Sequence, residues 1–93
     1  MDIPEGARPI QNPDVAWREI DGEAVLVVSS QSELKILNGT GTHIWKLCDG
    51  ELTIDNMAES ISDSFQVSLG DALDDIRVFI SELYGKRLVY FKT

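Results

Sequence analysis

The hydrophobic pattern changes its period partway along the chain. Up to residue 37, apolar and polar side chains largely alternate, which is the pattern of half-buried β-strands. From residue 44 onward, apolar side chains recur every three or four positions, which is typical of amphipathic helices. The sequence therefore predicts strands first and helices second, and an α+β fold in which helices cover a small antiparallel sheet.

Three strands are predicted in the first half, at 15–20, 23–28 and 33–37, with a loop at 29–32. The first two are separated by the dipeptide Asp-Gly at 21–22. This pair is a strong hairpin signal, because both of its residues tolerate the positive φ that a two-residue turn requires.

The N-terminal residues 1–13 contain all three prolines of the chain. Proline removes backbone donors, so this segment is predicted to be an extended arm that leads into the domain, and not a packed element. Residues 14–93 are then long enough for one modest core and too short for two. We therefore expect one domain after a short arm.

The first helix is predicted to be short. After the third strand, residues 38–41 (Asn-Gly-Thr-Gly) form a predicted sharp connection, because asparagine and glycine tolerate unusual backbone angles. Ile44, Leu47 and Cys48 then fall on one helical face. The helix is expected to close at Asp-Gly 49–50.

Two longer helices follow. The earlier one is predicted to start after an N-cap at Thr53, with Leu52 and Met57 placed to form a hydrophobic staple. The later one begins near Ser68 and ends at Gly85, followed by a short β-prone C-terminal segment. The predicted buried stripes consist of Ile54, Met57, Ala58, Ile61 and Phe65 in the earlier helix, and of Leu69, Leu73, Ile76, Ile80 and Leu83 in the later one.

Charge narrows the classes of partner. Sixteen acidic residues face eight basic ones, a formal net charge of −8, which repels phosphate backbones. If the protein bound DNA, its third helix would be the one to enter the major groove. That helix, however, carries four acidic residues against one internal arginine, Arg77; the acidic residues are Asp71, Asp74, Asp75 and Glu82. A single cysteine favours a reducing compartment, and neither a signal sequence nor a membrane-spanning apolar segment is evident. We expect a cytoplasmic protein without nucleic-acid or membrane partners.

Candidate catalytic groups are sparse. His43 and Cys48 are the only nucleophile and base that could pair, but five helical positions separate their directions by about 140°. One histidine and one cysteine do not complete a zinc site. Gly39 and Gly41 lack the lysine and the spacing of phosphate-binding loops. We expect no catalysis, no metal and no cofactor, and we expect Trp45 to lie in the core or at its edge, with contact to a ligand as the alternative.

Residues 37–50 contain a motif of the form LN-x-x-G-x-x-IW-x-x-x-DG. This motif resembles the PqqD family, named for pyrroloquinoline quinone biosynthesis protein D. Members are small recognition elements that bind the leader of a ribosomally made precursor peptide and present it to a modifying enzyme. The resemblance implies a winged-helix-like topology, with a three-stranded antiparallel sheet, three helices and a short C-terminal strand.

The resemblance also implies a mode of binding. The leader peptide would add as a strand beside residues 33–37 and lie in the groove between that strand and the third helix. Phe79 on one edge of the helix would serve as an apolar anchor, and Arg77 on the other edge would pair with leader carboxylates. The sequence leaves open which edge lines the groove. The predicted peptide-binding residues are Leu34, Lys35, Ile36, Leu37, Asp75, Ile76, Arg77, Phe79 and Leu83.

Catalysis would then belong to a partner, which the resemblance implies is a radical S-adenosylmethionine enzyme or another peptide-modifying enzyme. The pathway can be that of pyrroloquinoline quinone or of another peptide product. The alternative hypothesis is an interaction or regulatory module that keeps the fold without binding a leader. A monomer and a weak homodimer, swapped or paired through strand edges, both stay open.

Overall fold

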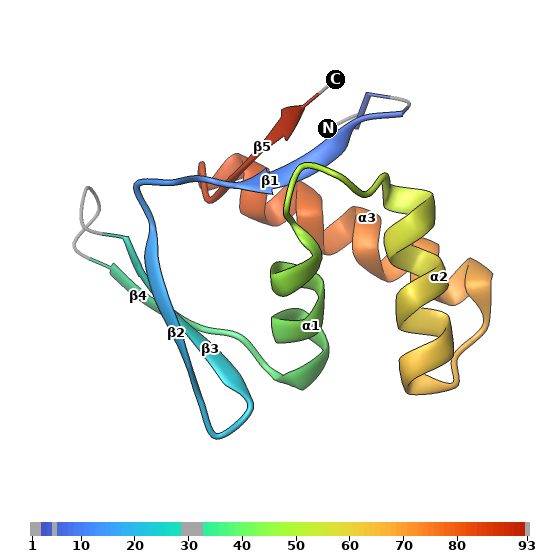
Figure 1. Cartoon of the computed structure of the whole chain (residues 1–93), viewed down its shortest axis with the longest axis horizontal. Helices are drawn as coiled ribbons and strands as arrows, with labels where there is room; N and C mark the ends of the chain where they lie inside the picture. Colours follow the sequence, from blue (N-terminus) through green and yellow to red (C-terminus); the bar gives the residue numbers. More distant parts are fainter. Residues whose placement is uncertain (1–2, 5, 29–32, 93) are drawn as a thin grey trace.

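The structure is a computed structural model that describes residues 3–4, 6–28 and 33–92, so the loop predicted at 29–32 lies outside the described residues. Within these residues, four strands precede three helices and a fifth strand follows them (Figure 1). The strands are β1 (Arg8–Gln11), β2 (Ala16–Ile20), β3 (Glu23–Val28), β4 (Glu33–Ile36) and β5 (Val89–Lys92). The helices are α1 (Gly39–Leu47), α2 (Ile54–Phe65) and α3 (Leu69–Gly85).

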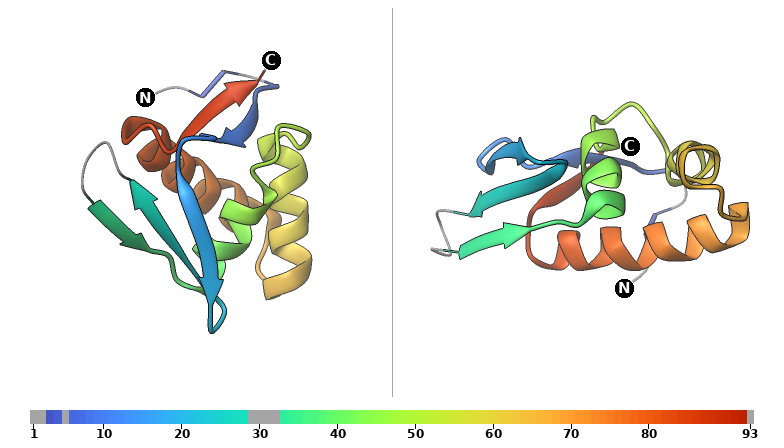
Figure 2. Two further views of the ribbon diagram at one scale, coloured as in Figure 1. Left: turned by 60° about the vertical axis from the view of Figure 1, so that its left-hand side comes forward. Right: turned by 90° about the horizontal axis from the view of Figure 1, so that it is seen from below.

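The strands form two separate sheets. One is antiparallel and three-stranded in the order β2-β3-β4, and the other pairs β1 with β5. Helix α1 stands between the three-stranded sheet and α2, while α3 runs across behind them (Figures 1 and 2). This arrangement confirms the predicted α+β fold with a three-stranded sheet, three helices and a C-terminal strand.

The β2–β3 hairpin forms where the Asp-Gly signal predicts it. Asp21 and Gly22 have φ values of 51° and 83°, and Ile20 pairs with Glu23 across a two-residue turn. Positive φ at both central positions twists the turn in the same sense as the strands it joins, which explains why this dipeptide favours a hairpin.

The N-terminal arm is extended, as its prolines indicated, but part of it is packed, which corrects the prediction of an unpacked lead-in. Strand β1 pairs with β5, and its Ile10 lies opposite Tyr90. On its other side, the N–H of Gln11 donates to the Cys48 carbonyl and the N–H of Gly50 donates to the Pro9 carbonyl. The missing N–H of proline therefore does not exclude it from this short strand.

The side chain of Gln11 fastens β1 to two tryptophans. Its amide donates to the Trp45 carbonyl at 2.9 Å and its oxygen accepts from the indole of Trp17 at 3.0 Å. The two indole rings meet edge to face, with centroids 6.0 Å apart. Trp45 is fully buried, which confirms its predicted place in the core.

The connection between β4 and α1 differs from the predicted sharp turn. Asn38 is the N-cap of α1, and its side-chain oxygen accepts from the N–H of Gly41 at 2.8 Å. Gly39 and Gly41 therefore belong to the first helical turn, and neither has a positive φ. Because the asparagine cap starts the helix only two residues after β4 ends at Ile36, no separate turn is required.

The caps of the longer helices follow the sequence closely, with one exception. Thr53 and Asn56 form a capping box at the start of α2, and Ser68 caps α3. Helix α3 ends at Gly85, as predicted, but the left-handed residue that follows the cap is Arg87, with φ of 62°. The N–H of Arg87 donates to the Tyr84 carbonyl and the N–H of Leu88 donates to the Leu83 carbonyl, which together form a Schellman motif.

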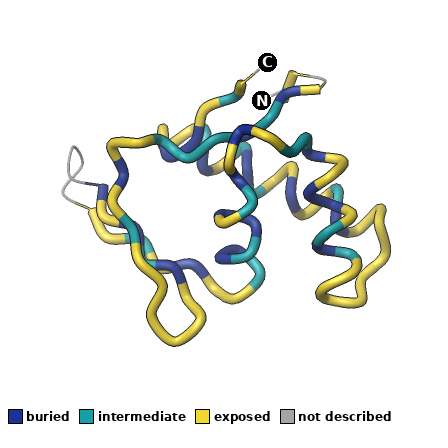
Figure 3. The backbone as a smooth tube through the Cα atoms, viewed as in Figure 1, coloured by how far each residue is buried: buried dark blue, intermediate teal, exposed yellow. Residues whose placement is uncertain are grey.

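The core lies where the three helices face one another and the sheet (Figure 3). Two predicted core positions are wrong: Phe65 is 38% exposed and Leu69 is 48% exposed. Both flank the connection between α2 and α3, where Phe65 keeps one ring contact, to His43 of α1. Ala72, which is not among the residues of the predicted stripe, is completely buried. Among the described residues, no helix has the length and apolar character needed to cross a bilayer.

Candidate peptide-binding site

Strand β4 lies at an edge of the three-stranded sheet. Its inner side pairs with β3 in a register that sets Ile36 opposite Val25 and Leu34 opposite Val27. The N–H of Leu37 donates to the Ala24 carbonyl at 2.9 Å. Because bonded and non-bonded pairs alternate along an antiparallel ladder, the main-chain groups of Leu34 and Ile36 point away from β3. No described strand occupies that outer side of β4.

Side chains of β4 alternate between two environments. Leu34 and Ile36 lie on the outer face of the sheet and are each 65% exposed. Lys35 and Leu37 lie on the opposite face, where Leu37 is buried and Lys35 is partly covered. The edge therefore offers unpaired main-chain donors and acceptors together with exposed apolar side chains, an unusual combination for a strand that stays solvent-exposed.

A groove runs beside this edge, with a volume of about 450 Å³. Strand β4, the start of α1 and the middle of α3 all contribute to its walls. Its lining consists of Lys35, Ile36, Leu37, Asn38, Thr40, Gly41, Ile44, Asp75 and Phe79. The groove thus combines an apolar floor with one cationic and one anionic side chain, and the open main-chain edge of β4 lies next to it.

The sequence did not indicate which edge of α3 faces the groove, and the structure shows which one does. Asp75 and Phe79, one helical turn apart, line the groove, whereas Arg77 does not. The ring of Phe79 lies close above the first turn of α1: a Cβ built on Gly41 would be 3.2 Å from its Cζ atom. Glycine at this position therefore allows the close approach of α3 to α1 that forms the floor of the groove.

Comparison with known proteins agrees with the family resemblance that the motif at residues 37–50 indicates. The family model described as coenzyme PQQ synthesis protein D (PqqD) matches residues 23–89, from the first residue of β3 to the first of β5. The chain belongs to the PqqD family. No curated protein matches it at a significant level.

Two solved structures share the fold of this PqqD-family chain. One, named "TbiB1 in Complex with the TbiA(beta) Leader Peptide", is 24% identical with a TM-score of 0.79, and the match covers 86% of this chain and 93% of that one. The other, "Lasso peptide synthetase B1 complexed with the leader peptide", is 20% identical with a TM-score of 0.80, covering 90% and 99% of the respective chains.

The predicted site residues divide into two groups in this PqqD-family structure. Lys35, Ile36, Leu37, Asp75 and Phe79 line the groove. Ile76 and Leu83 are completely buried in the core, Leu34 projects from the outer face of the sheet, and Arg77 is exposed outside the groove. Residues that the sequence analysis did not assign to the site, Asn38, Thr40, Gly41 and Ile44, complete the lining. The motif at residues 37–50 could have indicated these four residues, because a helix that starts within three residues of the end of β4 must border the same groove.

The groups considered for catalysis do not meet. Cys48 is buried, and its thiol donates to the Ile44 carbonyl at 3.3 Å. Burial, together with the nearby charge of Asp49, raises the pKa of this thiol to about 12, so it stays protonated and weakly nucleophilic at neutral pH. His43 instead contacts the Ser60 hydroxyl of α2 at 3.3 Å and the ring of Phe65.

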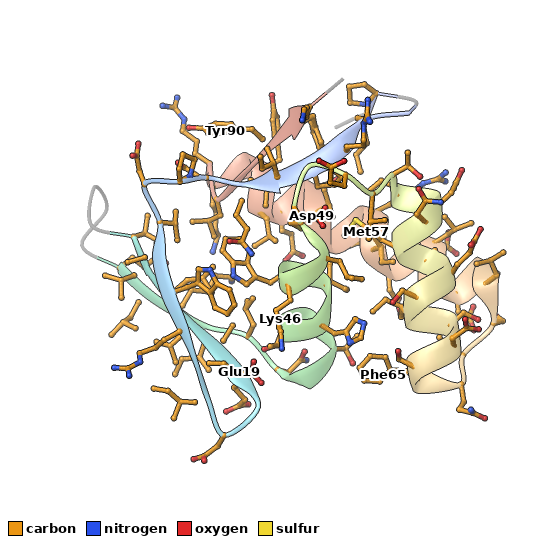
Figure 4. The ribbon with its side chains drawn as sticks, viewed as in Figure 1. Glu19, Lys46, Asp49, Met57, Phe65 and Tyr90 are labelled. Atoms are coloured by element: carbon orange, nitrogen blue, oxygen red, sulfur yellow. The ribbon has the colours of Figure 1, made fainter. Side chains whose placement is uncertain are left out.

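Other polar groups near α1 also have structural partners. Lys46 of α1 forms an exposed ion pair with Glu19 of β2 at 2.9 Å, and the two side chains point toward each other in Figure 4. An exposed pair of this kind contributes little to stability. Within the described residues, no group of three or more His, Cys, Asp or Glu side chains is arranged to hold a metal ion.

Proposed function

We propose that this chain binds the leader of a ribosomally made precursor peptide by strand addition to β4. The observation that carries the proposal is the open β4 edge directly beside the groove. An added strand would use the main-chain groups of Leu34 and Ile36, and its own side chains would alternate between two faces. Both solved relatives described above are named as complexes with leader peptides.

The groove defines what the peptide side chains would meet. Those on one face of the added strand would enter the groove against Phe79, Ile44 and Leu37, which favours an aliphatic or aromatic anchor. Lys35 and Asp75 would flank that anchor and select peptides with complementary charges on either side of it. The alternate side chains would join Leu34 and Ile36 on the outer face.

The bound leader would then be presented to a separate modifying enzyme, of the radical S-adenosylmethionine class or another peptide-modifying class. Holding the precursor next to that enzyme raises its effective concentration without any chemistry in this chain. The protonated, buried thiol of Cys48 and the separate position of His43 support this non-catalytic role. The thiol is also consistent with our proposal that the protein works in the cytoplasm.

A capture experiment with two proline variants tests strand addition. Ile36→Pro removes an outward N–H that a bound strand would use while leaving every bond to β3 in place. Glu19→Pro is the matched control, because the same ladder alternation points its N–H outward from the opposite edge of the sheet. Tagged proteins would be incubated with lysate of the native organism, and bound peptides and enzymes identified by mass spectrometry.

We expect the unmodified chain and Glu19→Pro to recover the same short ribosomal peptide, and Ile36→Pro to lose most of it. Equal recovery by Ile36→Pro would contradict strand addition at β4. Recovery of no peptide by any of the three, from cells that express the pathway, would favour the interaction or regulatory module that lacks leader binding.

A further inference from the structure

The same edge of β4 fits a second copy of this chain. An isolated edge strand with unpaired main-chain groups is a template for another strand, and proteins usually place charges there to prevent pairing. Glu33 and Lys35 are such charges, and they flank Leu34. Their opposite signs and their spacing of two residues, however, make them complementary to themselves in one antiparallel register.

We propose that two copies pair through their β4 edges about a two-fold axis that passes between their Leu34 residues. Leu34 would exchange both main-chain hydrogen bonds with Leu34 of the second copy, because its N–H and carbonyl point outward. Glu33 would then lie directly opposite Lys35 of the other copy, and the same pair recurs on the far side of the axis.

The charges select this register over its neighbours. The smallest shift that keeps the outward groups paired is two residues. A shift in one direction sets Lys35 opposite Lys35 of the second copy, and a shift in the other direction sets Glu33 opposite Glu33. Like charges directly opposite each other are destabilising, so both shifted registers are disfavoured. The complementary register also brings together two outer faces on which Leu34 and Ile36 are each 65% exposed and Val27 is 44% exposed.

Paired in this way, the β4 edges would be hidden from any other strand. This consequence rests on the proposed function: the dimer and the leader-bound monomer use the same main-chain groups of Leu34, so each excludes the other. Leader binding would dissociate the dimer, and the apparent affinity for the leader would fall as the protein concentration rises. The net charge of −8 on each copy opposes association and keeps the dimer weak.

A charge-exchange series measured on the chain alone tests the dimer. Sedimentation velocity across a range of protein concentrations would give the dimer dissociation constant of the unmodified chain. Glu33→Lys and Lys35→Glu each convert two attractive pairs per dimer into repulsive ones, so each should weaken dimerisation by roughly tenfold. The double variant Glu33→Lys/Lys35→Glu restores opposite charges and should recover the original constant.

The control is Glu59→Lys, an exposed position on α2 with the same change of net charge as Glu33→Lys. It should alter dimerisation far less than Glu33→Lys does. A chain that stays monomeric at every concentration, or a double variant no better than its single parents, would overturn the proposal. These measurements need no leader, so they decide the dimer even if leader binding fails. If the captured peptide binds and the dimer persists, the two do not compete for the same edge of β4, and that part of the proposal is wrong.

Discussion

At the scale of single residues, the shape of the groove depends on the absence of a Cβ atom at Gly41. A Cβ on Gly41 would lie 3.2 Å from both the Phe79 ring and the Asn38 side-chain oxygen that caps α1. Gly41→Ala should therefore displace the ring or the cap and lower the free energy of unfolding by about 1 kcal/mol. It should also weaken binding of the captured peptide, as measured by calorimetry.

The neighbouring glycine supplies the control for this prediction. Gly39 is also in the first turn of α1, but a Cβ there would meet nothing within 4 Å. Gly39→Ala should leave stability unchanged or raise it by up to about 1 kcal/mol, because alanine loses less backbone entropy on folding. Equal urea midpoints for the two alanine variants would contradict the role assigned to Gly41.

At the scale of secondary-structure elements, Thr42 connects α1 to the strand that forms the groove. Its hydroxyl accepts from the Ala24 N–H at 2.7 Å and donates to the Leu37 carbonyl at 3.2 Å. It thereby substitutes for the ladder bond that those two main-chain groups would otherwise make with each other. Thr42 is 3% exposed, so water cannot replace the hydroxyl.

Removing this hydroxyl should be costly. Thr42→Val keeps the shape of the side chain but leaves a buried donor and a buried acceptor without partners, which we expect to cost about 2–4 kcal/mol. Thr42→Ser keeps the hydroxyl and loses only a methyl group, so it should cost about 1 kcal/mol. Urea denaturation of both variants measures the difference, and a serine variant less stable than the valine variant would refute this account.

At the scale of the whole molecule, β1 closes the fold outside the matched family region, which begins at residue 23. It pairs with β5 on one side and with residues 48–50 on the other. A chain that begins at residue 12 should lose those hydrogen bonds and the burial of Ala7 and Pro9, and its free energy of unfolding should fall by about 3 kcal/mol. A chain that begins at residue 3 keeps all of β1 and is the control. Equal stability of the two chains would contradict a structural role for β1.

The sequence by itself determined the features that depend on neighbouring residues. The Asp21-Gly22 hairpin, the caps at Thr53 and Ser68, and the order of the elements from β2 to β5 follow from local backbone preferences and hydrophobic period. The sequence also predicts Phe79 as an apolar anchor, and Phe79 lines the groove; its binding role stays a prediction.

Only the tertiary structure decided which surfaces meet. Periodicity defines a helical stripe but not its limits, so the predicted stripe includes Leu69 and omits Ala72, whereas in the packed molecule Leu69 is exposed and Ala72 is buried. The pairing of β1 with β5 joins residues about eighty positions apart, and no local signal encodes such a contact. The same holds for the groove, whose walls come from β4, α1 and α3 and exist only once these elements have packed together.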